Sequence, residues 1–203
     1  LFNLIAESGE YSIETWVTPN NVTQEGPARI INYSAGNENR NFMLGQTQYN
    51  YNFFHRNENS DDIGNPVLST ADDDERLQAS LQHVVVTYKP QEGRRIYVNG
   101  IYTGDEDSNL STSISDWNSQ YQFSLGSFDS EYAWNGIVRM VAIHNRALTT
   151  DQISQNFDAG VGQKFLLLFN ITDLVNIDDC WDSFIVFEAA EYDNYSYLFN
   201  QPY

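Results

Sequence analysis

Short segments in which apolar side chains recur at every second position run through this 203-residue chain. In YSIETWVTP (11–19), one face carries Tyr11, Ile13, Thr15 and Val17 and the other carries Ser12, Glu14 and Trp16, up to Pro19, which cannot donate to a β-ladder. The pattern continues in ARIINYS (28–34), NFMLGQ (41–46), YNYNFFH (49–55), LQHVVVTYK (81–89), RRIYVNG (94–100), YQFSLGS (121–127) and IVRMVAIHN (137–145). Because Gly, Pro, Asn and Asp turns separate these strands, the sequence predicts an all-β antiparallel sandwich.

Two short helices interrupt the strand pattern. In the segment 149–159, Thr149 and Gln152 form a capping box, and Gly160 stands where a left-handed residue ends a helix. The first eight residues, LFNLIAES, carry apolar side chains at helical spacing and precede Gly9. We therefore expect a helix near 149–159 and a shorter one at 1–8.

The texture of the sequence changes after Gly162. KFLLLFNIT (164–172) is almost continuously apolar, and FIVFEAAEYDNYSYLFNQP (184–202) is typical of two aromatic-rich strands around a turn. We predict one domain over 1–163. Residues 164–203 are expected to complete the sandwich, because an isolated hairpin is rarely stable, or to lead into a following module.

Charge excludes several classes of partner. The chain has 28 acidic and 10 basic residues, a net charge of −18, which repels nucleic acid and anionic membranes. Its apolar runs are shorter than the roughly 18 residues of a membrane-spanning helix, so membrane insertion is not expected. The single cysteine, Cys180, excludes an internal disulfide and a thiolate zinc cluster. Acidity suits an extracellular or saline setting, or binding of divalent cations.

The stretch LQHVVVTYKPQEGRRIYVNGIYTG (81–104) predicts a three-stranded meander. Alternation places His83 on the same face as Lys89 and gives the opposite, apolar face to Val84, Val86 and Tyr88. KPQEGR forms the first turn, and Asn-Gly tolerates the positive φ angles of a type I′ turn at the second.

This meander resembles the H-V-x-x-T-Y-x-x-x-x-G-x-x-x-Y-V-N-G pattern of laminin-G-like domains, which belong to the concanavalin-A-like jelly-roll superfamily. YSIETWVTP is similar to that family's early strand, and residues 134–160 are similar to its ending, a strand followed by N-R-A-L and a short helix. The matches occur in family order over 13–160. The resemblance implies a jelly roll. It also implies a module of a larger exported bacterial protein, located outside the cell, on its surface or in the periplasm.

Catalysis is not indicated by the residue patterns. A general base needs a partner within hydrogen-bond reach, and no neighbour in the sequence supplies one to His83. Glycosidases of this fold carry an E-x-D-x-x-E arrangement on one strand, whereas the nearest acidic cluster here, Glu188, Glu191 and Asp193, has another spacing. We predict a non-enzyme and keep a polysaccharide-active glycosidase or lyase as the less favoured alternative.

Calcium is the cofactor that the acidic loops suggest. Carboxylate and amide oxygens are its preferred ligands, and Asp105, Asp107, Asn109 and Asp116 have the spacing of EF-hand positions 1, 3, 5 and 12. Leu110, however, replaces the glycine of position 6. Related jelly rolls often hold calcium at a sandwich rim. We therefore hypothesise one structural calcium bound by part of Asp105, Asp107, Asn109, Asp116 and Asp129, with solvated acidic loops as the alternative.

Aromatic residues on presumed loops are the candidates for ligand binding. Exposed rings stack on sugar faces, although large aromatics also dominate β cores. The candidates are Tyr49, Tyr51, Trp117, Tyr132 and Trp134. The predicted function is a binding or adhesion module that recognises carbohydrate or protein. The alternative is a structural subunit or spacer that packs on other domains of a larger chain.

Overall fold

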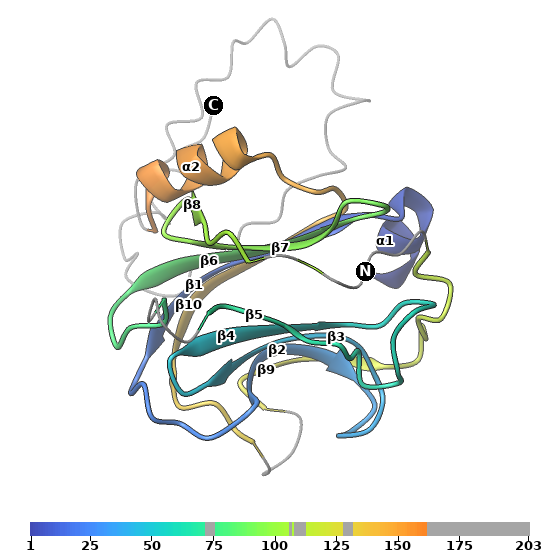
Figure 1. Cartoon of the computed structure of the whole chain (residues 1–203), viewed down its shortest axis with the longest axis horizontal. Coiled ribbons are helices and arrows are strands. Elements are labelled where there is room, and N and C mark those ends of the chain that lie inside the picture. Colours follow the sequence, from blue (N-terminus) through green and yellow to red (C-terminus); the bar gives the residue numbers. More distant parts are fainter. Residues whose placement is uncertain (72–75, 106, 108–112, 128–131, 162–203) are drawn as a thin grey trace, which may run out of the picture. The chain divides into compact units, whose positions relative to one another are not determined.

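The computed structural model describes residues 1–71, 76–105, 107, 113–127 and 132–161. Within these residues, two antiparallel sheets of five strands each lie face to face as a sandwich (Figure 1). Sheet A has the order β10-β1-β6-β7-β8, and sheet B has the order β5-β4-β3-β2-β9. The predicted all-β sandwich is confirmed.

The strands follow the alternating segments of the sequence closely. They are β1 (Tyr11–Pro19), β2 (Ala28–Ser34), β3 (Arg40–Thr47), β4 (Asn50–His55), β5 (Leu68–Ser69), β6 (Gln82–Lys89), β7 (Gly93–Val98), β8 (Ile101–Tyr102), β9 (Gln122–Leu125) and β10 (Gly136–His144). β5 was not predicted, because two residues are too short for a period to be visible.

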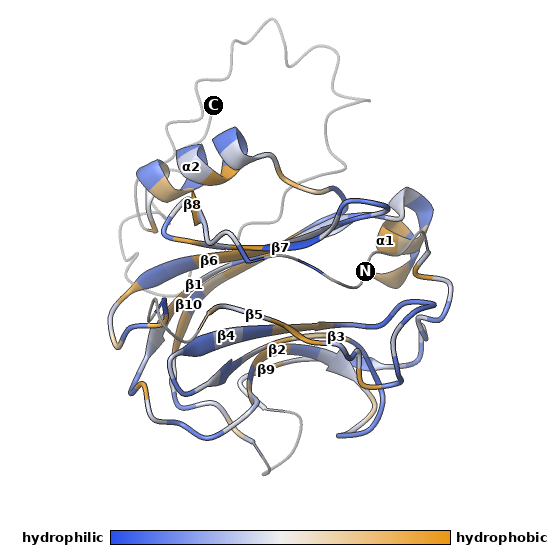
Figure 2. Ribbon diagram, in the orientation of Figure 1, coloured by the Kyte–Doolittle hydropathy of each residue, from blue (hydrophilic) through white to orange (hydrophobic). Residues whose placement is uncertain are grey.

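The main core lies between the two sheets. Ile13 and Val17 of β1, Val84 and Val86 of β6, and Phe53 of β4 are all fully buried in one cluster. These residues come from the apolar faces that the alternation predicted. Figure 2 shows apolar segments along the strands of both sheets and on the side of the helix above sheet A.

The predicted meander is present as β6-β7-β8. Asn99 and Gly100 connect β7 to β8 with φ angles of 52° and 78°. Two successive positive φ angles are characteristic of a type I′ turn, as the sequence predicted. Val84, Val86 and Tyr88 face the core, and His83 lies on the opposite, outer face of sheet A.

Both predicted helices are present. α1 (Phe2–Ser8) ends at Gly9, whose φ of 72° is left-handed. α2 (Thr150–Ala159) begins with the capping box, in which the Thr149 hydroxyl accepts from the Gln152 amide. Gly160 has a φ of 69° with a ψ of 166°, so it turns the chain without the left-handed helical conformation expected of it.

One charged side chain joins the two sheets through the core. Arg94 of β7 in sheet A is 1% exposed, and its guanidinium donates to the Phe53 carbonyl of β4 in sheet B at 2.9 Å. It also donates to the Pro66 carbonyl and forms an ion pair with Asp107 at 2.8 Å. Arg94 therefore fixes the loop that carries Asp107 against both sheets.

The prediction for residues 164–203 lies outside the described residues and stays a prediction. Within the part of the chain that the structure describes, no helix has the length and apolar character needed to cross a membrane.

Candidate ligand-binding site on the outer face of sheet A

α2 lies against part of the outer face of sheet A (Figure 1). Val85 of β6 and Tyr97 of β7 form a second apolar cluster with two residues from above the sheet. These are Leu148, in the loop before α2, and Ile153, in the first turn of α2. The Ser12 hydroxyl ties that loop down, because it donates to the Arg146 carbonyl and accepts from the Leu148 amide, both at 2.8 Å. α2 and its leading loop therefore form a fixed wall above the sheet.

A network of polar side chains lies beneath α2. One carboxylate oxygen of Glu14 on β1 accepts from Nε2 of His83 on β6 at 2.9 Å. The other accepts from Nε2 of His144 on β10 at 3.0 Å and from the side-chain Nδ2 of Asn156 on α2 at 2.9 Å. Burial alone would raise the pKa of Glu14, but the hydrogen bonds from the two histidines overcome it and lower that pKa to about 2.

This network joins the helix to the sheet and is poorly placed for catalysis. Glu14 is 4% exposed and His83 is fully buried, so a substrate has no access to the atoms that contact one another. A carboxylate with a pKa near 2 is a weak base at neutral pH. His83 has the structural position that the sequence predicted, and its acidic partner, Glu14, comes from β1 rather than from a neighbour in the sequence.

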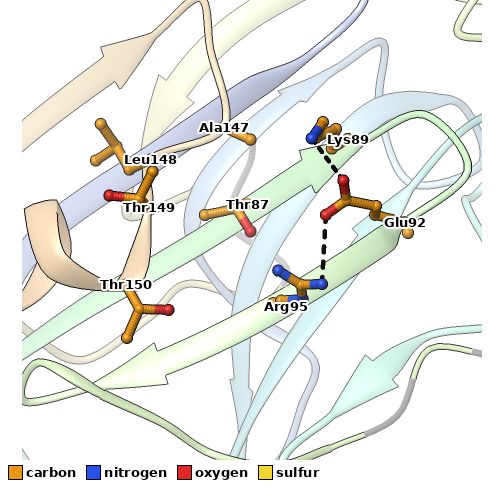
Figure 3. Close-up of a pocket in the computed structure, with 9 residues that line it drawn as sticks. Thr87, Lys89, Glu92, Arg95, Ala147, Leu148, Thr149 and Thr150 are labelled. Carbon is orange, nitrogen blue, oxygen red and sulfur yellow. Dashed lines mark hydrogen bonds and ion pairs between the residues drawn. The ribbon is translucent and has the colours of Figure 1, made fainter.

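An open pocket of about 240 Å³ lies at the amino-terminal end of α2. Strands β6 and β7 form its floor and the loop before α2 forms one side, as Figure 3 shows. Its lining consists of Thr87, Lys89, Glu92, Gly93, Arg95, Ala147, Leu148, Thr149 and Thr150.

Charged side chains occupy the end of the pocket that faces the β6–β7 turn. Glu92 lies between Lys89 and Arg95 (Figure 3), with Oε1 at 2.5 Å from Lys89 Nζ and Oε2 at 3.4 Å from an Arg95 amino group. All three side chains are exposed by 43–49%. The hydrogen bond to Glu92 raises the pKa of Lys89, and the same bond lowers the pKa of Glu92. Both groups are therefore ionised at neutral pH.

A second pocket of the same volume, about 240 Å³, lies at the other end of β1. Its described lining is uncharged: Thr18, Pro19, Asn20, Ala79, Asn135, Gly136 and Ile137. The two pockets therefore differ in charge while they match in size. The first is the stronger candidate, because convergent charged and hydroxyl groups are what fix a polar ligand in a shallow site.

The structure separates the five predicted ligand-binding aromatics. Tyr51, Trp117 and Trp134 are buried, and each satisfies its polar atom internally, through Gln82, the Arg56 carbonyl and Gln46 respectively. These three rings offer no face to a ligand. Tyr49 and Tyr132 are 38% and 51% exposed and keep the property that the prediction needs.

The predicted calcium ligands are also divided. Asp107 is 3% exposed, and both of its carboxylate oxygens accept from Arg94. Asp116 is exposed, whereas Asn109 and Asp129 lie outside the described residues. Asp105 has one buried oxygen, Oδ2, that lacks a hydrogen-bond partner among the described residues. No group of three or more His, Cys, Asp or Glu side chains suited to a metal converges in the described part of the chain.

Sequence reasoning missed the groups that meet across strands. Glu14 and Trp16 were placed on one face of β1 by alternation, but the pairing of β1 with β6 and β10 was not known. Lys89 and Arg95 were assigned to the ends of two strands and Glu92 to the turn between them, but no shared site was inferred from these three residues. Their spacing around KPQEGR was the available signal, because a hairpin brings residues on both sides of its turn together.

Comparison with known proteins agrees with this architecture. The sequence profile described as the concanavalin A-like lectin/glucanases superfamily (Laminin_G_3) matches residues 3–154. Adhesion G-protein coupled receptor D1 of Homo sapiens is 31% identical over 93 residues, and that of Bos taurus is 31% identical over 100 residues. These matches cover 45% and 46% of this chain but only 11% of each receptor.

Solved structures with a similar fold include botulinum neurotoxin binding domains. The binding domain of neurotoxin DC, in complex with rat synaptotagmin II, has a TM-score of 0.53 at 19% identity, over 76% of this chain and 36% of that one. A neurotoxin type C structure, described as showing an interaction with two ganglioside molecules, has a TM-score of 0.55 at 18% identity, over 78% and 38%. At these identities the likeness shows the fold alone. Because the matching profile spans well over half of the sequence, the chain belongs to the laminin-G-like family of the concanavalin A-like superfamily.

Proposed function

We propose that this domain is a non-catalytic recognition module that binds a carbohydrate or protein ligand in the pocket lined by Lys89, Glu92 and Arg95. The observation that carries the proposal is the open pocket itself, where exposed charged side chains and threonines line a fixed floor and wall. Its small volume suits one sugar ring or one side chain of a protein, because sites for drug-sized ligands are larger, at about 300–1,000 Å³.

The relatives support a binding role outside the cell. The two similar receptors are named for adhesion, and the neurotoxin domains of similar fold are described with synaptotagmin and gangliosides. We infer an extracellular or cell-surface location and a place within a larger chain, with partners among its other domains. Nucleic acid is not an expected partner, because the net charge of −18 opposes it.

A catalytic role has less support in the described residues. The acid–histidine network of Glu14, His83 and His144 is covered by α2, and its carboxylate is a poor base. The groups of the open pocket are two cations, one carboxylate and threonine hydroxyls. Those groups can orient and hold a ligand through charge and hydrogen bonds.

Two matched substitutions, each of an alanine by tryptophan, test the proposal. Ala147→Trp fills the first pocket, and Ala79→Trp fills the second, uncharged pocket of the same size. The wild-type chain and both variants are screened on a glycan array and against adhesion-protein ectodomains. We expect Ala147→Trp to lose binding at least tenfold and Ala79→Trp to keep it. Equal binding by all three proteins would exclude the first pocket as the site.

A second candidate function is that of a structural subunit or interdomain spacer. Large apolar side chains are exposed on the outermost described strands: Ile101 on β8, Phe123 and Leu125 on β9, and Ile137 on β10, with exposures of 40–64%. Such edges can pack on neighbouring domains. Concentration-dependent assembly in analytical ultracentrifugation, together with a blank glycan array, would favour this function over ligand recognition.

Calcium at the sandwich rim remains part of the proposal. The buried, unpartnered Oδ2 of Asp105 is an oxygen that a cation could satisfy, whereas Asp107 is engaged by Arg94. We expect a calcium site to depend on Asp105 rather than on Asp107. The test is titration calorimetry with calcium chloride on the wild type and Asp105→Asn, together with thermal unfolding in calcium and in chelator. An absence of both heat and a change in melting temperature would remove calcium from the account.

A further inference from the structure

The two cations of the first pocket share a single carboxylate. Lys89 and Arg95 project from neighbouring strands, β6 and β7, and each contacts a different oxygen of Glu92 (Figure 3). The described lining therefore carries two positive charges and one negative charge. These charges sum to +1, in contrast to the net charge of −18 of the whole chain.

Glu92 occupies the position that an external carboxylate would take. Its two oxygens bridge Lys89 Nζ at 2.5 Å and the Arg95 amino group at 3.4 Å. A ligand carboxylate placed between the same cations would make the same two contacts. Glu92 thus marks where a ligand carboxylate would bind and also competes with it for the same two cations.

Displacement of Glu92 requires little rearrangement. All three side chains are exposed by more than 40%, and exposed ion pairs contribute little to stability because water screens them. Glu92 belongs to the turn between β6 and β7, so its side chain can rotate outward while both strands keep their pairing. The cations would stay in place on the sheet.

The rest of the pocket suits the hydroxyl groups of a sugar. Thr87 on the floor and Thr150 on the wall both line this space, and the Thr150 hydroxyl lies 3.4 Å from the Tyr97 hydroxyl. The Thr149 hydroxyl accepts from the Gln152 amide and holds the wall instead. Hydroxyls beside cations, in a space of about 240 Å³, match a single ring that carries both hydroxyl groups and a carboxylate.

We propose that the pocket binds a carboxylate-bearing sugar residue, whose carboxylate replaces Glu92 between Lys89 and Arg95. The inference rests on the proposed recognition function and specifies its ligand class. It accounts for the pairing of two cations around one displaceable acid in an otherwise strongly acidic chain.

The test uses two sugars that differ only at C6, methyl β-glucuronide and methyl β-glucoside, titrated into the full 203-residue chain by calorimetry and NMR. A charge contact at about 4 Å in water changes binding about fivefold. We expect the glucuronide to bind about five- to tenfold more tightly than the glucoside. Glu92→Gln should tighten the glucuronide about fivefold and Arg95→Gln should weaken it by a similar factor, and each should change the affinity for the glucoside by a smaller factor.

Three outcomes overturn the inference. Equal affinity for the two sugars, abolished by Ala147→Trp, would leave the recognition function standing and remove the acidic preference. A Glu92→Gln variant that binds the glucuronide no better than wild type would exclude the displacement step. Binding of neither sugar would overturn the inference, and the glycan array and ectodomain screen would then decide the proposed function separately. Unchanged melting temperatures confirm that the exposed substitutions leave the fold intact.

Discussion

Substitution of Asp107 by Asn tests whether this acid is a structural anchor or a calcium ligand. In the structure, Asp107 Oδ2 accepts from the Arg94 backbone amide at 2.6 Å and from Nε at 2.9 Å, and Oδ1 accepts from the guanidinium at 2.8 Å. Both side chains are almost fully buried, at 1% and 3% exposure. The substitution would leave the Arg94 charge in the core without its counterion.

The magnitude follows from the burial of the pair. Removal of one partner from a buried ion pair costs about 3–5 kcal/mol in the free energy of unfolding. In a chain of this size, 1 kcal/mol lowers the melting temperature by roughly 2–4 °C, so a fall of about 10 °C is expected. The double variant Arg94→Met with Asp107→Leu should be less destabilised than Asp107→Asn, because it leaves no unpaired buried charge. It should remain below wild type, since the Phe53 and Pro66 carbonyls lose their donor.

Urea and thermal unfolding, each followed by circular dichroism in calcium and in chelator, provide the assay. The loss in Asp107→Asn should be the same in both buffers. Asp116→Asn, an exposed acid from the same proposed calcium set, is the control and should change the free energy of unfolding by less than about 0.5 kcal/mol. A loss below about 1 kcal/mol for Asp107→Asn, or one that appears only in calcium, would refute the anchoring role.

Three further substitutions test the outer face of sheet A by chemical and thermal unfolding. The pKa of Glu14 in the folded state, about 2, lies below its ordinary value of 4.5. Ionised Glu14 therefore contributes up to about 3 kcal/mol to the free energy of unfolding above pH 4.5, and this contribution disappears as the pH falls to about 2. Glu14→Gln should therefore be less stable at pH 7, and its free energy of unfolding should fall less steeply between pH 4.5 and pH 2. The same pH dependence of stability as in the wild type would contradict this role of Glu14. Thr149→Ala removes the capping box and should cost about 0.5–2 kcal/mol, whereas Thr149→Ser should recover most of the loss. Gly100→Ala should cost at least about 1 kcal/mol, because φ is 78° and the new methyl group would lie 3.0 Å from Phe157. Wild-type stability of this variant would show that α2 can shift to accommodate the methyl group.

The strands other than β5, the meander and both helices could be predicted from the sequence because their signals are local. Alternation in YSIETWVTP, the Asn99-Gly100 turn and the Thr149 capping box each act within a few residues. The apolar face of β6 was identified correctly for the same reason, since a strand sends successive side chains to opposite faces.

The sites could not be predicted to the same extent because they depend on pairing between distant strands. Glu14 meets His83 and His144 only after β1 pairs with β6 on one side and β10 on the other. Asp107 has EF-hand-like spacing in the sequence, yet the buried Arg94, thirteen residues earlier, engages it.

Burial of the predicted aromatics has a similar cause. Trp117 and Trp134 were expected on loops, where a ring with an N–H group is commonly exposed. Both are buried because distant acceptors, the Arg56 carbonyl and Gln46 Oε1, receive those N–H groups at 2.7 Å. A sequence does not display such acceptors, so the exposure of an aromatic ring follows from the tertiary structure.

NMR titration of the chain with methyl β-glucuronide decides whether the pocket between the β6–β7 hairpin and α2 is the ligand site. Binding in this pocket should give saturable amide shifts that concentrate at Thr87, Glu92, Arg95 and Thr150 and disappear in Ala147→Trp. Shifts that concentrate at Asn20, Asn135 and Ile137 of the second pocket, and persist in Ala147→Trp, would contradict it.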